Sequence, residues 1–368
     1  MSADVILKAE GLTKRFGGGG FMAKSPVVQA VSDIALEVRR GETFAIVGES
    51  GCGKSTLARL LMRLLEPTAG QVTFDGQDIS HVAGAGLTRL RRDMQFIFQD
   101  PFSSLNPRMT VGKLIGEPLE VHAPELTAHE RRRKVAELLQ QVGLPAEHAN
   151  RYPHEFSGGQ RQRIGIARAL ASGPKLIIGD EPVSALDVSV QAQVINLLGD
   201  LSRDLGLTLV IIAHDLGVIR HMSDRVAVMY LGRIVEMGTA AEVFESPRHP
   251  YTQALLASIP APRGTEDARP QLTGEMPSPS APPSGCAFHT RCPQATPACS
   301  AAIPAPMRIS DSGHSVACHR WADIPAPEGQ VTPPARSEAA EARFALYRAA
   351  LAGAAVHHAD PEHQDLKQ

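Results

Sequence analysis

The sequence predicts an α/β protein with a largely parallel sheet, and three features support this fold class. Short apolar strands alternate with helical stretches over residues 171–245, as in βαβ proteins. A glycine-rich loop, GESGCGKST, lies between an apolar strand and an apolar helix. The composition is that of a globular protein, with 43% hydrophobic and 21% charged residues. The 368 residues are enough for about two domains.

The expected elements follow in order along the chain. Residues 1–95 are predicted to be rich in strands, apart from one helix directly after the glycine-rich loop. Residues 100–170 are predicted to be helical, with turn-forming breaks at NPRMT and RYPHEFSGG. The α/β part is completed by KLIIGDEP, VQAQVINLLGDLSRDLG, LTLVIIAHD and DRVAVMYLGRIVEMG.

A change of composition near residue 260 indicates domain boundaries. A stretch rich in Pro, Gly and Ser has the character of an extended linker, and four cysteines follow it. A second Pro-rich stretch leads to an Ala-rich helix, expected at about residues 337–356, and to a polar end. We therefore expect three parts, at residues 1–260, 261–325 and 326–368.

Charge and composition exclude several classes of partner. The net charge is −2, so no overall field attracts nucleic acid or anionic lipid. One Trp and four Tyr are too few for a base-stacking surface. The N-terminus lacks the pattern of a signal peptide, and the apolar segments are too short to span a bilayer. We expect a soluble cytoplasmic protein, with any membrane role exerted through a partner and no nucleic-acid partner.

The glycine-rich loop predicts a phosphate site. It fits G-x-x-x-x-G-K-[ST] between a strand and a helix, as this motif requires. Its glycines allow backbone amides to wrap phosphates, Lys54 can reach the β- and γ-phosphates, and Ser55 can bind Mg²⁺. The predicted phosphate-binding residues are Gly48, Glu49, Ser50, Gly51, Cys52, Gly53, Lys54, Ser55 and Thr56.

An acidic pair ends the apolar strand KLIIGDE. Asp180 would hold the Mg²⁺ shell, and Glu181 could polarise an attacking water. Such a pair is more often part of a solvated loop, but the phosphate loop favours the catalytic interpretation.

The stretch FSGGQRQRIGIARAL predicts a helix with an anion site at its start. Ser157 is a good N-cap, and Gly158 and Gly159 leave the backbone amides accessible. The positive end of the helix dipole would also attract an anion to this position. Taken alone, the stretch also fits an ordinary capped basic helix.

Together, GESGCGKST, FSGGQRQR, LIIGDEP and AHD resemble an ATP-binding cassette ATPase of the transporter type, over residues 5 to about 320. The resemblance implies a RecA-like core, an antiparallel β subdomain, a helical subdomain at about 100–170 and a small Cys-rich C-terminal extension. It implies ATP and Mg²⁺ as ligands. It also implies that the signature residues contact ATP held by the opposite subunit; these are Ser157, Gly158, Gly159 and Gln160.

The resemblance assigns further roles by position in the motifs. Gln99 matches the glutamine that reaches Mg²⁺ and water, Asp187 the dimer-crossing aspartate, and His214 the histidine on the γ-phosphate. Phe16 matches the aromatic that stacks on adenine. The implied catalytic residues are Glu181, His214 and Gln99, and the implied Mg²⁺ ligands are Ser55, Gln99 and Asp180. Because the signature face comes from a second chain, a monomer should hydrolyse ATP slowly.

Three further stretches are similar to oligopeptide and dipeptide importer ATPases of the second-ATPase type: QDPFSSLNPRMTVG, HPYTQALLASIP and PSGCAFHTRCPQATPAC. The similarity implies a peripheral subunit on the cytoplasmic face of the inner membrane. The implied partners are a second ATPase subunit, two permease subunits and, through them, a substrate-binding protein. Importers of nickel and other solutes share these motifs, so the substrate stays open. Phe102, Leu105 and Met109 suit either a permease groove or the core.

The cysteine pattern is compatible with several states. Its spacing lacks the short C-x₂₋₄-C pairs of structural zinc, but four thiolates are the number that an iron–sulfur cluster uses. The resembling family includes [4Fe–4S] binders. Zinc and metal-free packing remain alternatives, with His289, His314 and His319 as other possible ligands. The four cysteines are Cys286, Cys292, Cys299 and Cys318.

Two rival functions are a cassette ATPase acting on DNA or ribosomes and a regulatory module that only binds ATP. The first is disfavoured because no long insertion separates the phosphate loop from the signature and only one cassette is present. The second is disfavoured by Glu181, which a non-hydrolysing site would not need.

Overall fold

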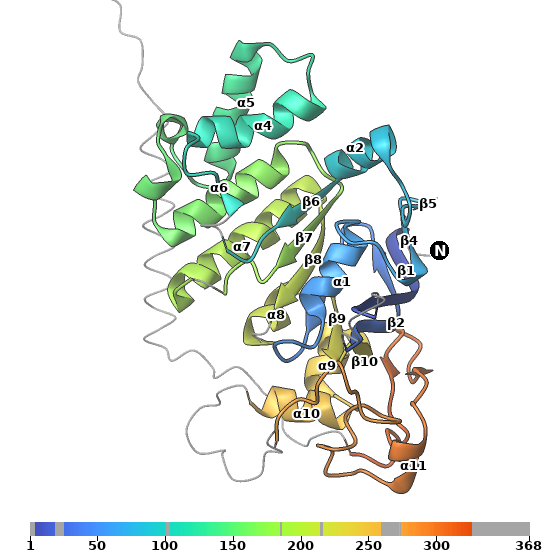
Figure 1. The fold of residues 1–368 in the computed structure, drawn as a ribbon. Coiled ribbons are helices and arrows are strands. Elements are labelled where there is room, and N and C mark those ends of the chain that lie inside the picture. The colour runs from blue at the N-terminus through green and yellow to red at the C-terminus, as the bar shows by residue number, and fades with distance from the viewer. Residues whose placement is uncertain are drawn as a thin grey trace, which may run out of the picture. The chain divides into compact units, whose positions relative to one another are not determined.

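The computed structural model describes residues 4–18, 26–100, 104–184, 186–213, 216–258, 272 and 274–325. These residues form an eight-stranded sheet of order β11-β12-β10-β9-β3-β8-β7-β6 and a four-stranded sheet of order β2-β1-β4-β5 (Figure 1). Helices flank the larger sheet. The predicted linker and the predicted Ala-rich helix lie largely or wholly outside the described residues.

The centre of the large sheet is parallel and buried on both faces. Its strands are β3 (Thr43–Val47), β6 (Met94–Ile97), β7 (Leu176–Asp180), β8 (Thr208–Ala213) and β9 (Arg225–Tyr230). Every residue of β3, β7 and β8 is buried, as expected when helices or a second sheet cover both faces. The α/β prediction is thereby confirmed.

Alternate residues of each central strand enter different cores. In β3, Phe44 and Ile46 contribute to one apolar cluster, and Ala45 and Val47 to the other. The first cluster includes α1 (Lys54–Leu61) and the antiparallel sheet. The second includes the helices on the opposite face. These are α6 (Gly158–Leu170), α7 (Val188–Leu205) and α8 (Leu216–Met222).

The antiparallel sheet comes from the N-terminal part of the chain. Its strands are β1 (Val5–Phe16), β2 (Val28–Arg39), β4 (Ala69–Phe74) and β5 (Gln77–Asp78). Buried and exposed residues alternate along the second half of β2, so one face packs on the core. A helix, α2 (Gly84–Asp93), follows β5 in a region predicted to contain strands.

A helical segment separates β6 from β7. It contains α4 (Val111–His122), α5 (Ala128–Gln141), two short 3₁₀ helices (Ala146–Asn150 and Pro153–Glu155) and α6. A capping box between Thr127 and Glu130 begins α5.

The C-terminal part of the described chain joins the large sheet. Its elements are β10 (Arg233–Thr239), α9 (Ala240–Glu245), α10 (Pro250–Ala257), α11 (Pro297–Ala301), β11 (Met307–Arg308) and β12 (Ser315–Val316). Strand β12 pairs with β10, placing Val316 opposite Glu236. Residues 274–325, called the C-terminal segment below, thus extend the sheet that carries the phosphate loop.

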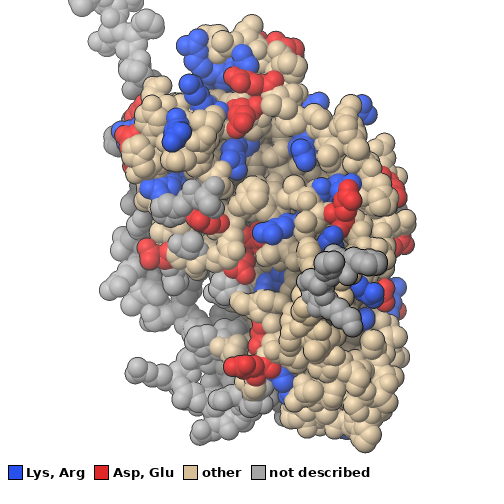
Figure 2. All heavy atoms as spheres, viewed as in Figure 1, with Lys and Arg blue, Asp and Glu red and all other residues tan. Residues whose placement is uncertain are grey.

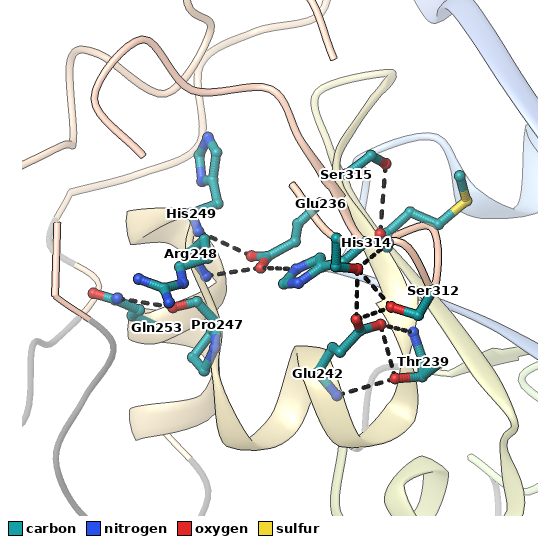
Figure 3. Close-up of polar contacts among 12 residues, drawn as sticks. Glu236, Thr239, Glu242, Pro247, Arg248, His249, Gln253, Ser312, His314 and Ser315 are labelled. Atoms are coloured by element: carbon teal, nitrogen blue, oxygen red, sulfur yellow. Dashed lines mark hydrogen bonds and ion pairs between the residues drawn. The ribbon is translucent and has the colours of Figure 1, made fainter. Parts of the chain in front are cut away.

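Buried polar contacts fasten this segment to β10 and the residues after it (Figure 3). The carboxylate of Glu236 accepts hydrogen bonds from the backbone N–H groups of Arg248 (2.7 Å) and His249 (2.9 Å). His314 Nε2 lies 2.8 Å from the same carboxylate. A buried carboxylate with three partners is satisfied, so this contact specifies how the segment docks.

Candidate functional site

The glycine-rich loop joins β3 to α1 at the carboxyl edge of the parallel strands. Gly48 and Gly53 have φ values of 153° and 106°. A Cβ atom would lie 2.1 Å from Met229 O at Gly48 and 2.2 Å from Ala30 O at Gly53. The backbone can therefore follow this path only with glycine at both positions.

Lys54 is buried and turned toward the loop. Its Nζ donates to the carbonyl oxygens of Gly48 (2.7 Å) and Glu49 (3.0 Å). The ammonium group is thus held inside the loop, where it can also meet phosphate oxygens.

The first acid of the predicted pair meets the loop. Asp180 ends β7, and its Oδ1 accepts a hydrogen bond of 2.9 Å from Ser55 Oγ. Burial raises the pKa of Asp180 above its ordinary value of 3.8, and the bond from Ser55 lowers it. A hydroxyl and a carboxylate at this spacing offer the oxygen ligands that Mg²⁺ prefers.

The second acid has a strained backbone. Glu181 has φ 46°, and its N–H donates to Ile212 O at 2.9 Å. A non-glycine residue in the left-handed region costs about 1–3 kcal/mol, a strain that clusters at active sites. Gln99 Nε2 donates to Glu181 Oε2 at 2.9 Å. The structure therefore brings five predicted site residues together, namely Lys54, Ser55, Gln99, Asp180 and Glu181.

A cavity of about 450 Å³ lies over the loop. Phe16, at the end of β1, forms part of its wall and is 39% exposed, with Lys14 Nζ 5.2 Å from the ring centroid. Its size suits a small ligand. Predicted site residues in its lining are Phe16, Ser50, Gly51, Cys52, Gly53, Lys54, Ser55, Thr56, Gln99 and Glu181.

Cys52 fills space within this loop. Its side chain is buried, and burial raises the pKa of the thiol. A protonated, buried thiol behaves as a small apolar group.

The signature residues lie away from this cavity. Ser157 caps α6 in a capping box with Gln160, whose Oε1 accepts from Ser157 N at 3.0 Å. A Cβ at Gly159 would lie 2.3 Å from the Val190 side chain of α7. Asp187 precedes α7. None of these residues lines the cavity over the loop, so within one chain the two halves of the predicted site are separate.

His214 follows β8 directly but lies outside the described residues. Phe102 also lies outside them. Leu105 is buried in the core and Met109 packs against the core. Of the two roles predicted for these residues, permease groove or core, the structure therefore supports the core.

A different groove, of about 340 Å³, has exposed apolar residues. It lies among α2, β6 and α4, and one of its lining residues, Phe98, directly precedes Gln99 in the chain. This groove was not predicted from the sequence. Its exposed apolar side chains are Leu64, Phe98 and Val121, between 43% and 57% exposed. Isolated exposed apolar residues carry no signal in a sequence, and only the fold brings these together.

The four cysteines share one very small cavity of about 10 Å³. Burial raises the pKa of Cys286 to about 11, and burial also raises the pKa values of Cys292 and Cys318. Within the described ranges, no group of three or more His, Cys, Asp or Glu side chains is arranged to hold a metal ion. The four thiols are free of disulfides.

The three histidines proposed as alternative ligands have other partners. His314 contacts Glu236, His289 Nδ1 lies 2.9 Å from Cys286 O, and His319 Nε2 lies 2.9 Å from Ala302 O. Each contact engages only one of the two ring nitrogens, and metal-ligating histidines commonly hydrogen-bond a carboxylate or carbonyl through the other nitrogen.

Sequence analysis also missed two contacts to the loop. Tyr251 Oη accepts a hydrogen bond of 2.8 Å from Glu49 N, and Arg291 pairs with the Glu49 carboxylate. Both residues lie in stretches quoted for the family resemblance, but no spacing rule connects them with a loop about two hundred positions away.

Charges of both signs are interspersed on the face shown in Figure 2, where no broad region carries one sign. No helix among the described residues has both the length and the apolar character needed to cross a bilayer.

Comparisons with known proteins agree with this geometry. A family model described as "ABC transporter" matches residues 31–184, and one described as "Oligopeptide/dipeptide transporter, C-terminal region" matches residues 235–299. The chain is 52% identical to a probable peptide ABC transporter ATP-binding protein of Sinorhizobium fredii, covering 90% of this chain and 94% of that protein. It is also 52% identical to the oligopeptide transport ATP-binding protein AppF of Bacillus subtilis, covering 86% and 98%.

Solved structures share the fold. An ATP-binding cassette, MJ0796, in a dimeric post-hydrolysis state with ADP and Pi has a TM-score of 0.58 and 31% identity, covering 64% of this chain and 99% of that one. CbiO1 of Clostridium perfringens has a TM-score of 0.57 and 31% identity, covering 66% and 91%.

Proposed function

Since the chain belongs to the family of peptide ABC transporter ATP-binding proteins, we propose that it is the ATP-hydrolysing subunit of an importer for oligopeptides or dipeptides. One observation carries the proposal. The phosphate loop, Asp180, Glu181 and Gln99 converge in a chain that also matches the oligopeptide transporter C-terminal region. An importer of nickel or another solute is the alternative, since this chain supplies energy and does not select the solute.

In this proposal each site residue has a defined task. The loop amides and Lys54 bind the phosphates of ATP, and Phe16 stacks on adenine. Ser55, Asp180 and Gln99 hold Mg²⁺, which would neutralise phosphate charge. Glu181 accepts a proton from the attacking water, and His214 contacts the γ-phosphate.

The separation of the signature from the cavity supports a dimer. Ser157, the two glycines after it and Gln160 would complete the nucleotide site of a second ATPase subunit, with Asp187 at the interface. ATP would then join the two subunits, and hydrolysis would release them.

We also propose that the importer contains two permease subunits, and that one of them docks on the groove of this chain formed by Leu64, Phe98 and Val121. Phe98 adjoins Gln99, so docking there can influence the hydrolytic site. Through the permease, the complex would receive solute from a binding protein. This assigns the chain to the cytoplasmic face of the membrane, as a peripheral subunit.

The [4Fe–4S] cluster at the four cysteines rests on the resemblance, and zinc remains an alternative because the number of thiols alone does not choose a metal. Four thiols surround one cavity and fit a cluster in number. The described residues do not fit either group, because no three of their His, Cys, Asp or Glu side chains are arranged as a ligand set. Assays of iron, sulfide and zinc on protein purified without oxygen distinguish these possibilities from metal-free packing.

The substitution Glu181→Gln tests the hydrolytic function. We expect it to lower the rate of Mg-ATP hydrolysis by a factor of about 10²–10⁴, the usual contribution of a general base, and to preserve ATP binding. Purified full-length protein, assayed for phosphate release and dimer formation with the second ATPase, gives both values. Glu147→Gln, at an exposed position, is the control. Wild-type hydrolysis by Glu181→Gln would refute the assignment.

A further inference from the structure

Glu49 places a negative charge inside the loop that is expected to bind phosphate. The loop gathers backbone amides and Lys54 around an anion, and a nearby carboxylate repels that anion. The Glu49 side chain is 27% exposed, so solvent screens it only in part. A cation beside Glu49 therefore reduces the repulsion between this carboxylate and a phosphate in the loop.

Arg291 of the C-terminal segment supplies that cation. Its Nη1 donates to Glu49 Oε2 at 2.7 Å, and its Nη2 donates to Oε1 at 3.1 Å. These two bonds form the bidentate pair typical of guanidinium and carboxylate groups. The Arg291 side chain is only 5% exposed, and its bonds to Glu49 raise its pKa further above the usual range.

Aromatic rings fix the position of the guanidinium. Its central carbon lies 5.8 Å from the ring centroid of Tyr230 and 6.0 Å from that of Phe288, within cation–π range. Tyr251 contacts both rings and accepts the Glu49 N–H. The backbone and the side chain of Glu49 are therefore both held by residues downstream of the loop.

A second contact connects the C-terminal segment with the same cavity. Pro279 lines it, and the Pro279 carbonyl accepts a hydrogen bond of 2.9 Å from Gln29 N on β2. The segment therefore reaches the candidate nucleotide site at two independent points.

We propose that Arg291 is a positioning residue for ATP: it neutralises Glu49 and holds the phosphate loop in the shape that receives the triphosphate. The proposal rests on the ATPase function proposed above and makes the C-terminal segment an integral part of the nucleotide site. Arg291 itself does not touch the reacting atoms. Its removal should thus change ATP affinity more than the rate of hydrolysis at saturation.

The test compares Arg291→Ala, Glu49→Gln and the double variant in the full-length chain. Titration with Mg-ATP should show about tenfold weaker binding for Arg291→Ala, and the double variant should recover most of this loss because the unpaired carboxylate is gone. The loss should shrink at high salt, since its origin is electrostatic. The KM for ATP should rise while kcat stays within about twofold. Binding is measured well below each variant's melting temperature, which separates affinity from folding.

Arg308→Ala is the matched control, because Arg308 belongs to the same segment but donates to the carbonyls of Ser310 and Asp311. It should bind Mg-ATP as the wild type does. Unchanged affinity in Arg291→Ala would overturn the proposal, while failure of the wild type to bind ATP would overturn the ATPase function itself. If Arg291→Ala does not fold, Arg291→Gln replaces it, because glutamine also removes the charge that neutralises Glu49. About threefold weaker binding then supports the proposal, and wild-type affinity contradicts it.

Discussion

Glycine positions in the phosphate loop are dictated by neighbouring backbone as well as by the phosphate. Gly53 is the N-cap of α1 and has φ 106°, and the carbonyl of Ala30 occupies the space that a side chain would need. The same strand that contributes Ala30 also lines the cavity. At Gly53 the loop therefore packs closely against the antiparallel sheet, and replacing this glycine should disturb both the loop and the packing against the sheet.

We expect Gly53→Ala to destabilise the protein by about 1–3 kcal/mol, the cost of a strained backbone, and to weaken ATP binding. Gly199→Ala is the matched control, because Gly199 lies inside α7 with no atom within 4 Å of the added methyl group. It should stabilise the protein by up to about 1 kcal/mol. Thermal unfolding and Mg-ATP titration measure both effects, and equal stability of the two variants would contradict this account.

At the scale of elements, α9 shows how a short helix anchors the C-terminal segment. Thr239 and Glu242 form a capping box at its start. Oε2 of Glu242 takes part in the cap, and its other carboxylate oxygen, Oε1, accepts hydrogen bonds from the hydroxyls of Ser310 (2.8 Å) and Ser312 (Figure 3). One side chain thus caps the helix and fixes the turn before β12.

This carboxylate makes stability depend on pH. Burial alone would raise the pKa of Glu242, but hydrogen bonds from Ser312, Thr239 and Ser310 lower it from 4.5 to about 2. A lowered pKa stabilises the fold above about pH 4.5, and this contribution is lost as the pH falls toward 2. We expect Glu242→Gln to cost about 1 kcal/mol at pH 7, the value of a helix cap, and less at pH 3.

Chemical denaturation at the two pH values gives the difference between wild type and variant. Glu147→Gln removes an exposed carboxylate without removing a cap, and is the control. A cost for Glu242→Gln that is the same at both pH values would show that the ionised carboxylate is not responsible.

At the scale of the whole molecule, local sequence patterns predicted the central parallel sheet and its phosphate loop, but they missed helix α2 and strand β12. Alternating apolar segments and the motif around Lys54 were sufficient for the parallel sheet and its loop. Helix α2 was missed because its apolar residues, Leu87 and Leu90, are few among small and basic ones. The pairing of β12 with β10 involves two residues per strand, too short for any periodic signal.

The Glu49–Arg291 pair was beyond sequence reasoning for another reason. It joins residues 242 positions apart, and either charge would fit an exposed surface equally well. Only the fold reveals that Arg291 lies against aromatic rings and that Glu49 lies beside it. Contacts of this kind depend on tertiary structure, which no local pattern of a single sequence encodes.

The groove that contains Phe98, the neighbour of Gln99, gives a prediction about the contact between this chain and the permease. Val121 is 57% exposed near the end of α4, and Leu205 is 48% exposed at the end of α7. A lysine is favourable near the carboxyl end of a helix, so neither Val121→Lys nor Leu205→Lys should reduce stability or the ATPase rate of the isolated chain by more than about twofold. In the reconstituted importer, we expect only Val121→Lys to reduce peptide uptake, about tenfold, because it places a desolvated charge in an apolar interface. Uptake of a labelled peptide into vesicles that contain the permeases measures this. Equal uptake by the two variants would place the permease contact elsewhere on the chain.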